Sequence, residues 1–123
     1  MKLESQVCSL ELSKKLKELE VPHKSLWVWE FADGVPSNLN AAAASGSNVY
    51  AYSVAELGEM LPTNISLMDW LQIQKGAAGF TVDYGHQEMD GSYCAAKEIS
   101  SASEADARAA MLIYLLENKL ITL

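Results

Sequence analysis

The sequence predicts one α+β domain over residues 1–123, in which a small antiparallel sheet of four to five strands carries about three helices, mainly on one face. Three segments place apolar residues at helical spacing, and several others alternate as strands do. Two of the strands are joined by a short turn that begins and ends with glycine. Because strands do not alternate regularly with helices, an antiparallel layered fold is favoured over a parallel one.

The first helix is expected over residues 7–20. Its apolar residues recur at spacings of four, four and three, which places them on one stripe: Cys8, Leu12, Leu16 and Leu19. Ser5 or Ser9 offers the N-cap. Pro22 ends the helix, because a proline disfavours the helical conformation of the residue before it.

A strand follows at residues 26–31, which are aromatic and β-branched and are followed by the turn dipeptide Asp33-Gly34. Residues 35–48 are expected to form a long loop, since they are rich in Pro, Ser, Asn, Gly and Ala. A short strand is expected at residues 49–52. After it, Ser53 and Glu56 match a capping box, which predicts a short helix that reaches Leu61 and is ended by Pro62.

A hairpin comes next. Strands are expected at residues 67–74 and 80–84, with a turn at residues 76–79, and a further strand at residues 92–99. In the strand at residues 80–84, the core-facing residues are expected to be Phe80, Val82 and Tyr84. Thr81 and Asp83 are expected to face outward.

The last helix is expected over residues 104–119. Ser101 and Ser103 both offer an N-cap, and Glu104 and Asp106 lie in the first turn, where the helix dipole favours acidic groups. Its apolar stripe is wide, which predicts a helix buried over much of its circumference.

Charge and composition exclude several classes of protein. Nine Lys and Arg against 16 Asp and Glu give a net charge of −7, which argues against a general nucleic-acid-binding protein. No apolar run approaches the roughly 20 residues of a membrane span, and no signal peptide is recognisable. The two cysteines, in no CxxC pattern, are therefore expected to be reduced thiols in a cytosolic protein.

Aromatic and basic residues supply the candidate ligand-binding site. A base or nucleotide could stack on aromatic faces beside a cation, and the candidates are Trp27, Trp29, Lys75, Tyr84 and Arg108. The competing interpretation is that the aromatic residues are ordinary sheet core. Likewise, the Arg108 guanidinium either binds a phosphate or carboxylate or pairs with Glu104 one helical turn earlier.

A second candidate site is a metal site, with Asp83, His86, Glu88 and Asp90 as ligands. The competing interpretation is a solvated acidic loop between two strands. No nucleophile motif, phosphate-binding loop or dinucleotide-binding motif occurs, so the sequence favours a binding protein over an enzyme and predicts no cofactor.

Three blocks carry a resemblance: VCSLELSKKLKEL at residues 7–19, VAELGEMLP at 54–62 and EADARAAMLIYLLEN at 104–118. Together they resemble a family of small proteins carried by bacteriophages and prophages, although Glu20 stands where a glycine would be the more usual helix end. The resemblance implies a phage origin and the cytoplasm of a bacterial host, and supplies no catalytic residues.

In that context, three functions are open. The preferred one is a non-enzymatic protein, expected to be a homo-oligomer, that sequesters a nucleotide signal of host immunity. The alternative is direct inhibition of a host protein by an apolar patch with a charged rim. A metal-dependent enzyme that uses the Asp83 to Asp90 segment is the third.

Overall fold

The computed structural model describes residues 5–30, 35–38 and 49–123. In chain order its elements are α1 (Leu10–Glu18), β1 (Trp27–Glu30), β2 (Val35–Asn38), α3 (Val54–Met60), β3 (Trp70–Gly76), β4 (Gly79–Gln87), β5 (Tyr93–Ser101) and α4 (Glu104–Glu117).

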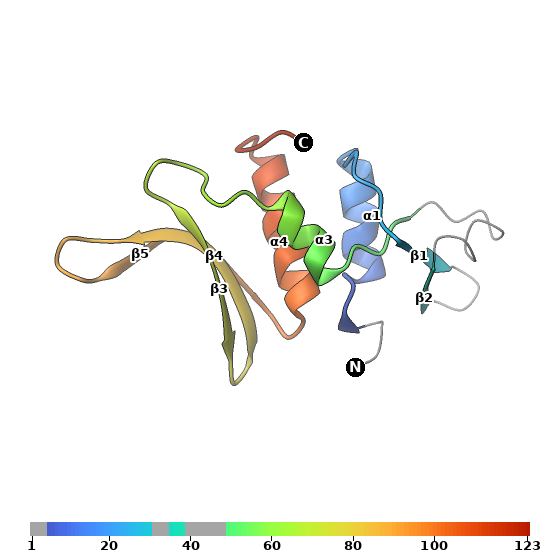
Figure 1. Ribbon diagram of the computed structural model, residues 1–123, viewed down its shortest axis with the longest axis horizontal. Helices are drawn as coiled ribbons and strands as arrows, with labels where there is room; N and C mark the ends of the chain where they lie inside the picture. Colours follow the sequence, from blue (N-terminus) through green and yellow to red (C-terminus); the bar gives the residue numbers. More distant parts are fainter. Residues whose placement is uncertain (1–4, 31–34, 39–48) are drawn as a thin grey trace.

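The helices lie between two antiparallel ladders (Figure 1). A three-stranded sheet of order β3-β4-β5 packs against α4, while β1 and β2 pair with each other on the far side of α1 and α3. The predicted α+β class with three helices is what the structure shows. One sheet of four to five strands is not confirmed, because in the described part of the chain β1 joins β2 and not the β3-β4-β5 sheet.

The start of α1 is fixed by Ser9. Its hydroxyl accepts a hydrogen bond from the Leu12 amide at 3.4 Å, so the helix begins at Leu10 and not at residue 7. Of the two predicted caps, Ser9 is therefore the one used. The Ser9 amide in turn donates to Asp106 Oδ1 at 2.7 Å, which ties the start of α1 to the first turn of α4.

Two helices end in left-handed residues that are not glycine. After α1, the Glu20 amide donates to the Lys17 carbonyl and the Val21 amide to the Leu16 carbonyl, the pattern of a Schellman motif. Glu20 has a φ of 59°, and Lys119 after α4 has a φ of 55°. A Cβ makes this conformation unfavourable, so each helix end carries local strain that a glycine would relieve.

Glu20→Gly is expected to stabilise the protein by about 1 kcal/mol, because glycine adopts the left-handed conformation without the Cβ clash. Urea unfolding followed by circular dichroism measures the change. Glu18→Gly is the matched control, since Glu18 is an exposed residue within the same helix. There, glycine is expected to cost about 1 kcal/mol. A loss of stability in Glu20→Gly similar to that of the control would contradict the prediction.

The predicted loop at residues 35–48 is wrong at its start. Residues 35–38 form β2, which pairs with β1 so that Trp29 lies opposite Pro36. Proline occurs in strands chiefly at edges, and this segment becomes a strand only because β1 supplies a partner. The predicted turn at Asp33-Gly34 and the rest of the loop, residues 39–48, lie outside the described residues.

Residues 49–52 run along the other side of β1. Trp29 donates its amide to the Val49 carbonyl, and the Ala51 amide donates to the Trp27 carbonyl, both at 2.9 Å. The pairing makes one isolated bridge, between Val28 and Tyr50, and not the short strand that the sequence predicts.

The three-stranded sheet places one face on α4. Val82 and Tyr84 are fully buried on that face, as predicted. Asp83, predicted to face outward into solvent, is only 4% exposed on the opposite face, because the Tyr93 side chain of β5 covers it. β4 also extends further than predicted, so that His86 lies within the strand and not in a loop.

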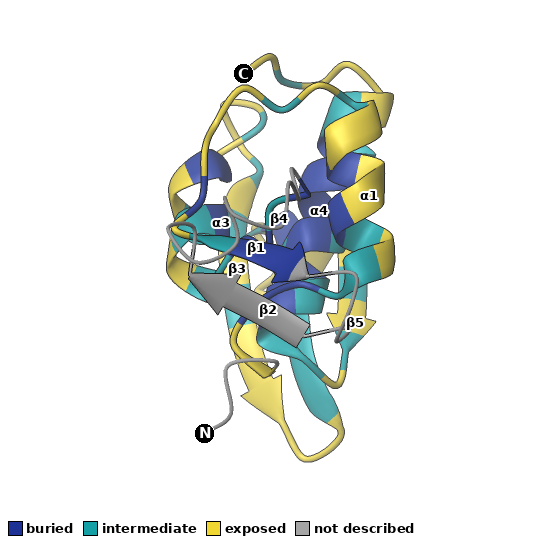
Figure 2. Cartoon of the chain, turned by 90° about the vertical axis from the view of Figure 1, so that its right-hand side faces the viewer, coloured by how far each residue is buried: buried dark blue, intermediate teal, exposed yellow. Residues whose placement is uncertain are grey.

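α4 is the centre of the main core. Ser103, not Ser101, caps it by accepting from the Asp106 amide. Most of its residues from Ala105 to Leu115 are buried, whereas α1 turns exposed residues outward (Figure 2). No helix in the described part of the chain is long and apolar enough to cross a membrane.

The capping box at the start of α3 is confirmed, and its glutamate does more than cap. Glu56 Oε1 accepts from the Ser53 amide at 2.9 Å and from the Ser25 hydroxyl at 2.7 Å. Glu56 Oε2 accepts from the Leu26 amide at 3.0 Å. One carboxylate therefore joins the start of α3 to the chain that enters β1.

Candidate functional site

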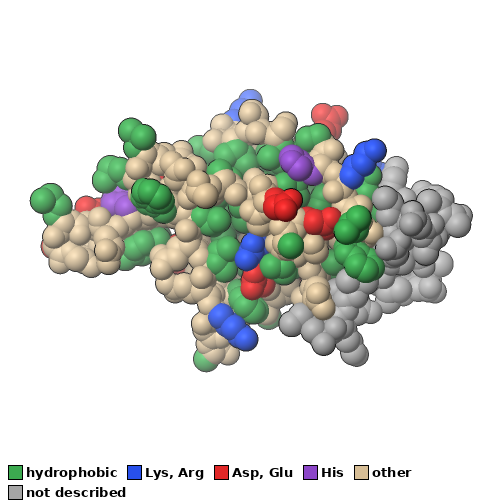
Figure 3. Space-filling view, viewed as in Figure 1, with side chains coloured by type: hydrophobic (Ala, Val, Ile, Leu, Met, Phe, Trp, Pro, Cys, Tyr) green, Lys and Arg blue, Asp and Glu red, His purple; other side chains and the backbone are tan. Residues whose placement is uncertain are grey.

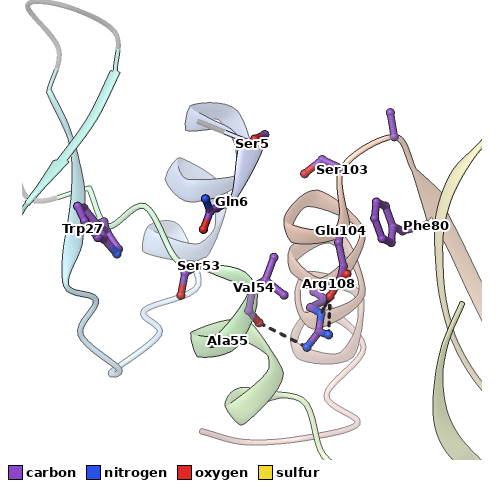
Figure 4. Close-up of a pocket in the computed structure, with 11 residues that line it drawn as sticks. Ser5, Gln6, Trp27, Ser53, Val54, Ala55, Phe80, Ser103, Glu104 and Arg108 are labelled. Atoms are coloured by element: carbon purple, nitrogen blue, oxygen red, sulfur yellow. Dashed lines mark hydrogen bonds and ion pairs between the residues drawn. The ribbon is translucent and has the colours of Figure 1, made fainter. Parts of the chain in front are cut away.

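A groove of about 720 Å³ opens beside the N-terminal ends of α3 and α4 (Figure 4). Trp27 of β1 lies at one end and Phe80 of β4 at the other, with Val54 and Arg108 between them. Its volume falls within the usual range of small-molecule sites, and most of its lining is apolar.

Arg108 is the cation of this groove, and its position is fixed. Nε donates to Glu104 Oε2 at 2.9 Å and Nη2 lies 2.6 Å from the same oxygen, while Nη1 makes a long 3.4 Å contact with the Val54 carbonyl. The guanidinium passes over Gly58, where any Cβ would overlap Nη1. The absence of a side chain at Gly58 is what lets the guanidinium lie against α3.

The predicted ligand-binding residues separate into two groups. Trp27 and Arg108 line the groove. Lys75 is not a lining residue, but its ammonium lies over the ring of the lining residue Phe80, 5.8 Å from the ring centre. Trp29 and Tyr84 are in the interior: Trp29 Nε1 donates to Ser13 Oγ at 3.0 Å, and the Tyr84 hydroxyl donates to the Pro62 carbonyl at 2.6 Å.

Phe80 is a groove residue that sequence reasoning assigned to the core. The alternation of β4 correctly predicts that the Phe80 side chain lies on the α4 face. The sequence does not show that Phe80 lies at the margin of the core, where its ring is only partly buried and lines the groove.

His86 is the centre of a second cluster at the far end of the sheet. Nδ1 lies 2.9 Å from Asp69 Oδ1, and Nε2 lies 3.0 Å from Glu88 Oε1. The hydrogen bond to Asp69 raises the pKa of His86 above its usual value, and the same bond lowers the pKa of Asp69. Cys94 faces His86 directly across the β4–β5 ladder.

Of the four predicted metal ligands, the structure brings together His86 and Glu88. Asp83 lies on the opposite face of the sheet, where it accepts from the Tyr93 hydroxyl at 2.9 Å. Asp90 belongs to the turn after β4 and accepts from the amide and the hydroxyl of Ser92. Asp69 and Cys94, which complete the cluster, were missed because only strand pairing brings them to His86.

Exposed hydrophobic side chains lie on the segments that carry this second cluster, although Trp70 and Tyr93 are on the sheet face opposite His86. We call these exposed side chains the distal surface: Leu67, Met68, Trp70, Met89 and Tyr93. Figure 3 shows several separate hydrophobic side chains on the end of the molecule where the β4–β5 hairpin lies. Large exposed apolar side chains are candidates for contact with a partner where they lie next to one another.

The two thiols are expected to differ sharply in reactivity. Cys8 is buried, and this burial raises its pKa to about 11, whereas Cys94 is exposed. A thiol reagent at pH 8 should modify one cysteine in the folded protein and the second only after unfolding. Rapid labelling of both thiols in the folded state would contradict this prediction.

The raised pKa of Cys8 also makes stability depend on pH. Above the usual thiol pKa of about 8.5, Cys8 ionises in the unfolded chain before it does so in the folded protein, so its contribution to stability falls as the pH rises toward 11.

Comparison of the chain with known proteins gives no match: no family model, curated protein or solved structure matches it. The geometry of the groove and of the His86 cluster therefore carries the functional conclusions.

Proposed function

We propose that this is a non-enzymatic binding protein whose groove holds a small anionic ligand with a planar ring, the chemistry of a nucleotide. The observation that carries the proposal is the convergence of Trp27, Phe80 and Arg108 on one groove from three separate elements. Half-buried aromatic rings offer stacking surfaces for a base, which contribute roughly 1–3 kcal/mol each in known complexes.

Arg108 supplies the anion-binding edge. Glu104 occupies the Nε and Nη2 side of the guanidinium, while Nη1 lies over Gly58 and donates one long hydrogen bond of 3.4 Å to the Val54 carbonyl. A phosphate oxygen would bind at the Nη1 edge, while Glu104 keeps the guanidinium in place. Lys75 at the Phe80 end adds a second positive charge near the groove, so a locally basic site is compatible with a net charge of −7.

The biological setting that we propose is counter-defence. The resemblance of the three sequence blocks to small phage and prophage proteins supports this setting: in the cytoplasm of a bacterial host, binding would sequester a nucleotide signal of host immunity. A homo-oligomer suits that role, since two copies of an open groove could enclose one ligand.

Calorimetry against cyclic dinucleotides, cyclic trinucleotides and ADP-ribose tests the proposal. Binding should be lost in Trp27→Ala and weakened at least tenfold in Arg108→Gln. The matched control is Trp70→Ala, because Trp70 is 61% exposed and is not among the residues that line the groove. Absence of heat with every ligand, or equal losses in Trp27→Ala and Trp70→Ala, would overturn it.

Inhibition of a host protein is the second candidate, and the distal surface is the observation that favours it. Here the expected variant effects are reversed. A host protein recovered with the wild-type chain should be lost with Trp70→Ala and retained with Trp27→Ala. The same pair of variants therefore distinguishes the two functions.

A further inference from the structure

We propose that His86, Glu88 and Cys94 form a binding site for Zn²⁺ at the distal end of the β4–β5 hairpin. Each residue offers one ligand atom, and these three atoms all lie within 4.8 Å of one another. The site is independent of the groove and does not rest on the function proposed for it.

The distances suit a metal. Zn–N and Zn–S bonds of about 2.0–2.3 Å in a tetrahedral site put neighbouring ligand atoms about 3.3–3.6 Å apart. Nε2 of His86 and Oε1 of Glu88 already lie 3.0 Å apart. Cys94 Sγ lies within 4.8 Å of both atoms, and rotation of this exposed side chain can bring the thiol to bonding distance.

Asp69 supplies the feature that separates this cluster from a chance grouping of polar residues. His86 Nδ1 lies 2.9 Å from the Asp69 carboxylate, and this contact orients the ring so that Nε2 faces Glu88; in the metal-binding tautomer Nδ1 carries the proton and donates it to Asp69. In metalloproteins, a carboxylate on the outer nitrogen of a ligating histidine commonly fixes its tautomer and orientation. Asp69 is thus a positioning residue and not a ligand.

The backbone holds the ligands in place. His86 and Cys94 are register partners in the β4–β5 ladder, so their Cβ atoms are neighbours across the strands. Glu88 begins the turn after β4, where its amide donates to the Ser92 carbonyl and its carbonyl accepts from the Gly91 amide. The ligands therefore come from a closed hairpin whose geometry does not depend on the metal.

The donor set selects the ion. A thiolate, an imidazole and one carboxylate suit Zn²⁺ and its spectroscopic substitute Co²⁺, whereas Mg²⁺ and Ca²⁺ prefer sites built from oxygen atoms. Three protein ligands leave a fourth position for water. Cys94 binds as the thiolate, and its proton is released to solvent.

Titration with Co²⁺ tests the site directly. One equivalent should produce a thiolate-to-cobalt charge-transfer band in the near ultraviolet, and one equivalent of Zn²⁺ should remove it. The band should be absent in Cys94→Ser and His86→Ala. Asp69→Asn should keep the band but weaken binding by about 10- to 100-fold.

Glu98→Gln is the matched control for Glu88→Gln, because Glu98 is an exposed glutamate on β5 that pairs with Asp83 and not with His86. Glu88→Gln should weaken Co²⁺ binding, and Glu98→Gln should not. In the wild type, Zn²⁺ should also protect Cys94 from a thiol reagent, a readout that needs no variant. No charge-transfer band, a band that survives Cys94→Ser, or unchanged labelling of Cys94 with Zn²⁺ would overturn the proposal.

Discussion

Replacing Trp29 with alanine is expected to lower the free energy of unfolding by about 3–5 kcal/mol. The Trp29 ring is 6% exposed and forms a small core cluster with Val7, Val49 and Ala51. Its Nε1 also donates to Ser13 Oγ, and Ser13 is itself buried and hydrogen-bonded to the Cys8 thiol. The substitution therefore opens a cavity and leaves a buried hydroxyl with one partner fewer.

Trp27→Ala is the matched comparison, two residues earlier on the same strand. The Trp27 ring is only partly buried, so the expected loss is smaller and the domain should remain folded. Urea denaturation monitored by circular dichroism measures both. If Trp27→Ala unfolded the domain, the assignment of this ring to a ligand-binding groove would fail.

The second large effect is expected for Glu56→Ala, at about 2–3 kcal/mol. The substitution removes the reciprocal half of the capping box together with the acceptors of the Ser25 hydroxyl and the Leu26 amide. Ser25 is buried, and without Glu56 its hydroxyl keeps only the Ala51 carbonyl at 3.3 Å as an acceptor, so the substitution weakens a buried hydrogen bond and not only an exposed one.

Glu59→Ala is the control, since Glu59 is an exposed glutamate on the same helix. It should change stability by less than about 0.5 kcal/mol. Thermal and urea unfolding of both variants and of Glu56→Gln provide the measurement. Glu56→Gln keeps one acceptor oxygen and is expected to lie between wild type and Glu56→Ala. Equal stability of Glu56→Ala and Glu59→Ala would show that the contacts of Glu56 contribute nothing.

The helices could be predicted because their signals are local. Ser53 with Glu56, and Ser103 with Asp106, lie within one helical turn of each other, and the structure confirms both pairs. For α1 the sequence offered two N-caps, Ser5 and Ser9. The structure uses Ser9, whose amide also makes a tertiary hydrogen bond to Asp106. Local propensity alone does not distinguish such alternatives.

The strands were predicted less completely, because a strand needs a partner. Residues 35–38 have a loop-like composition and become β2 through pairing with β1. His86 lies within β4 because Cys94 pairs with it eight residues later in the chain. Pairing partners of this kind are not encoded in the composition of either segment.

The candidate sites were also predicted only in part from the sequence. The sequence selected Trp27 and Arg108 for the groove, and His86 and Glu88 for the metal cluster, because these residue types carry the relevant chemistry. It also selected Trp29, Tyr84, Asp83 and Asp90, which the structure places in the core, on the opposite sheet face or in a turn. Residue type alone did not separate the two groups.

The sequence by itself determined the α+β class, the three helices and most of the residues that face the core, since capping and periodicity act over a few residues. Only the tertiary structure decided that the strands divide into two ladders, that Phe80 and Arg108 share a groove, and that Asp69 and Cys94 meet His86. The physical reason is distance along the chain: these contacts join residues that are brought together only when strands pair and helices pack.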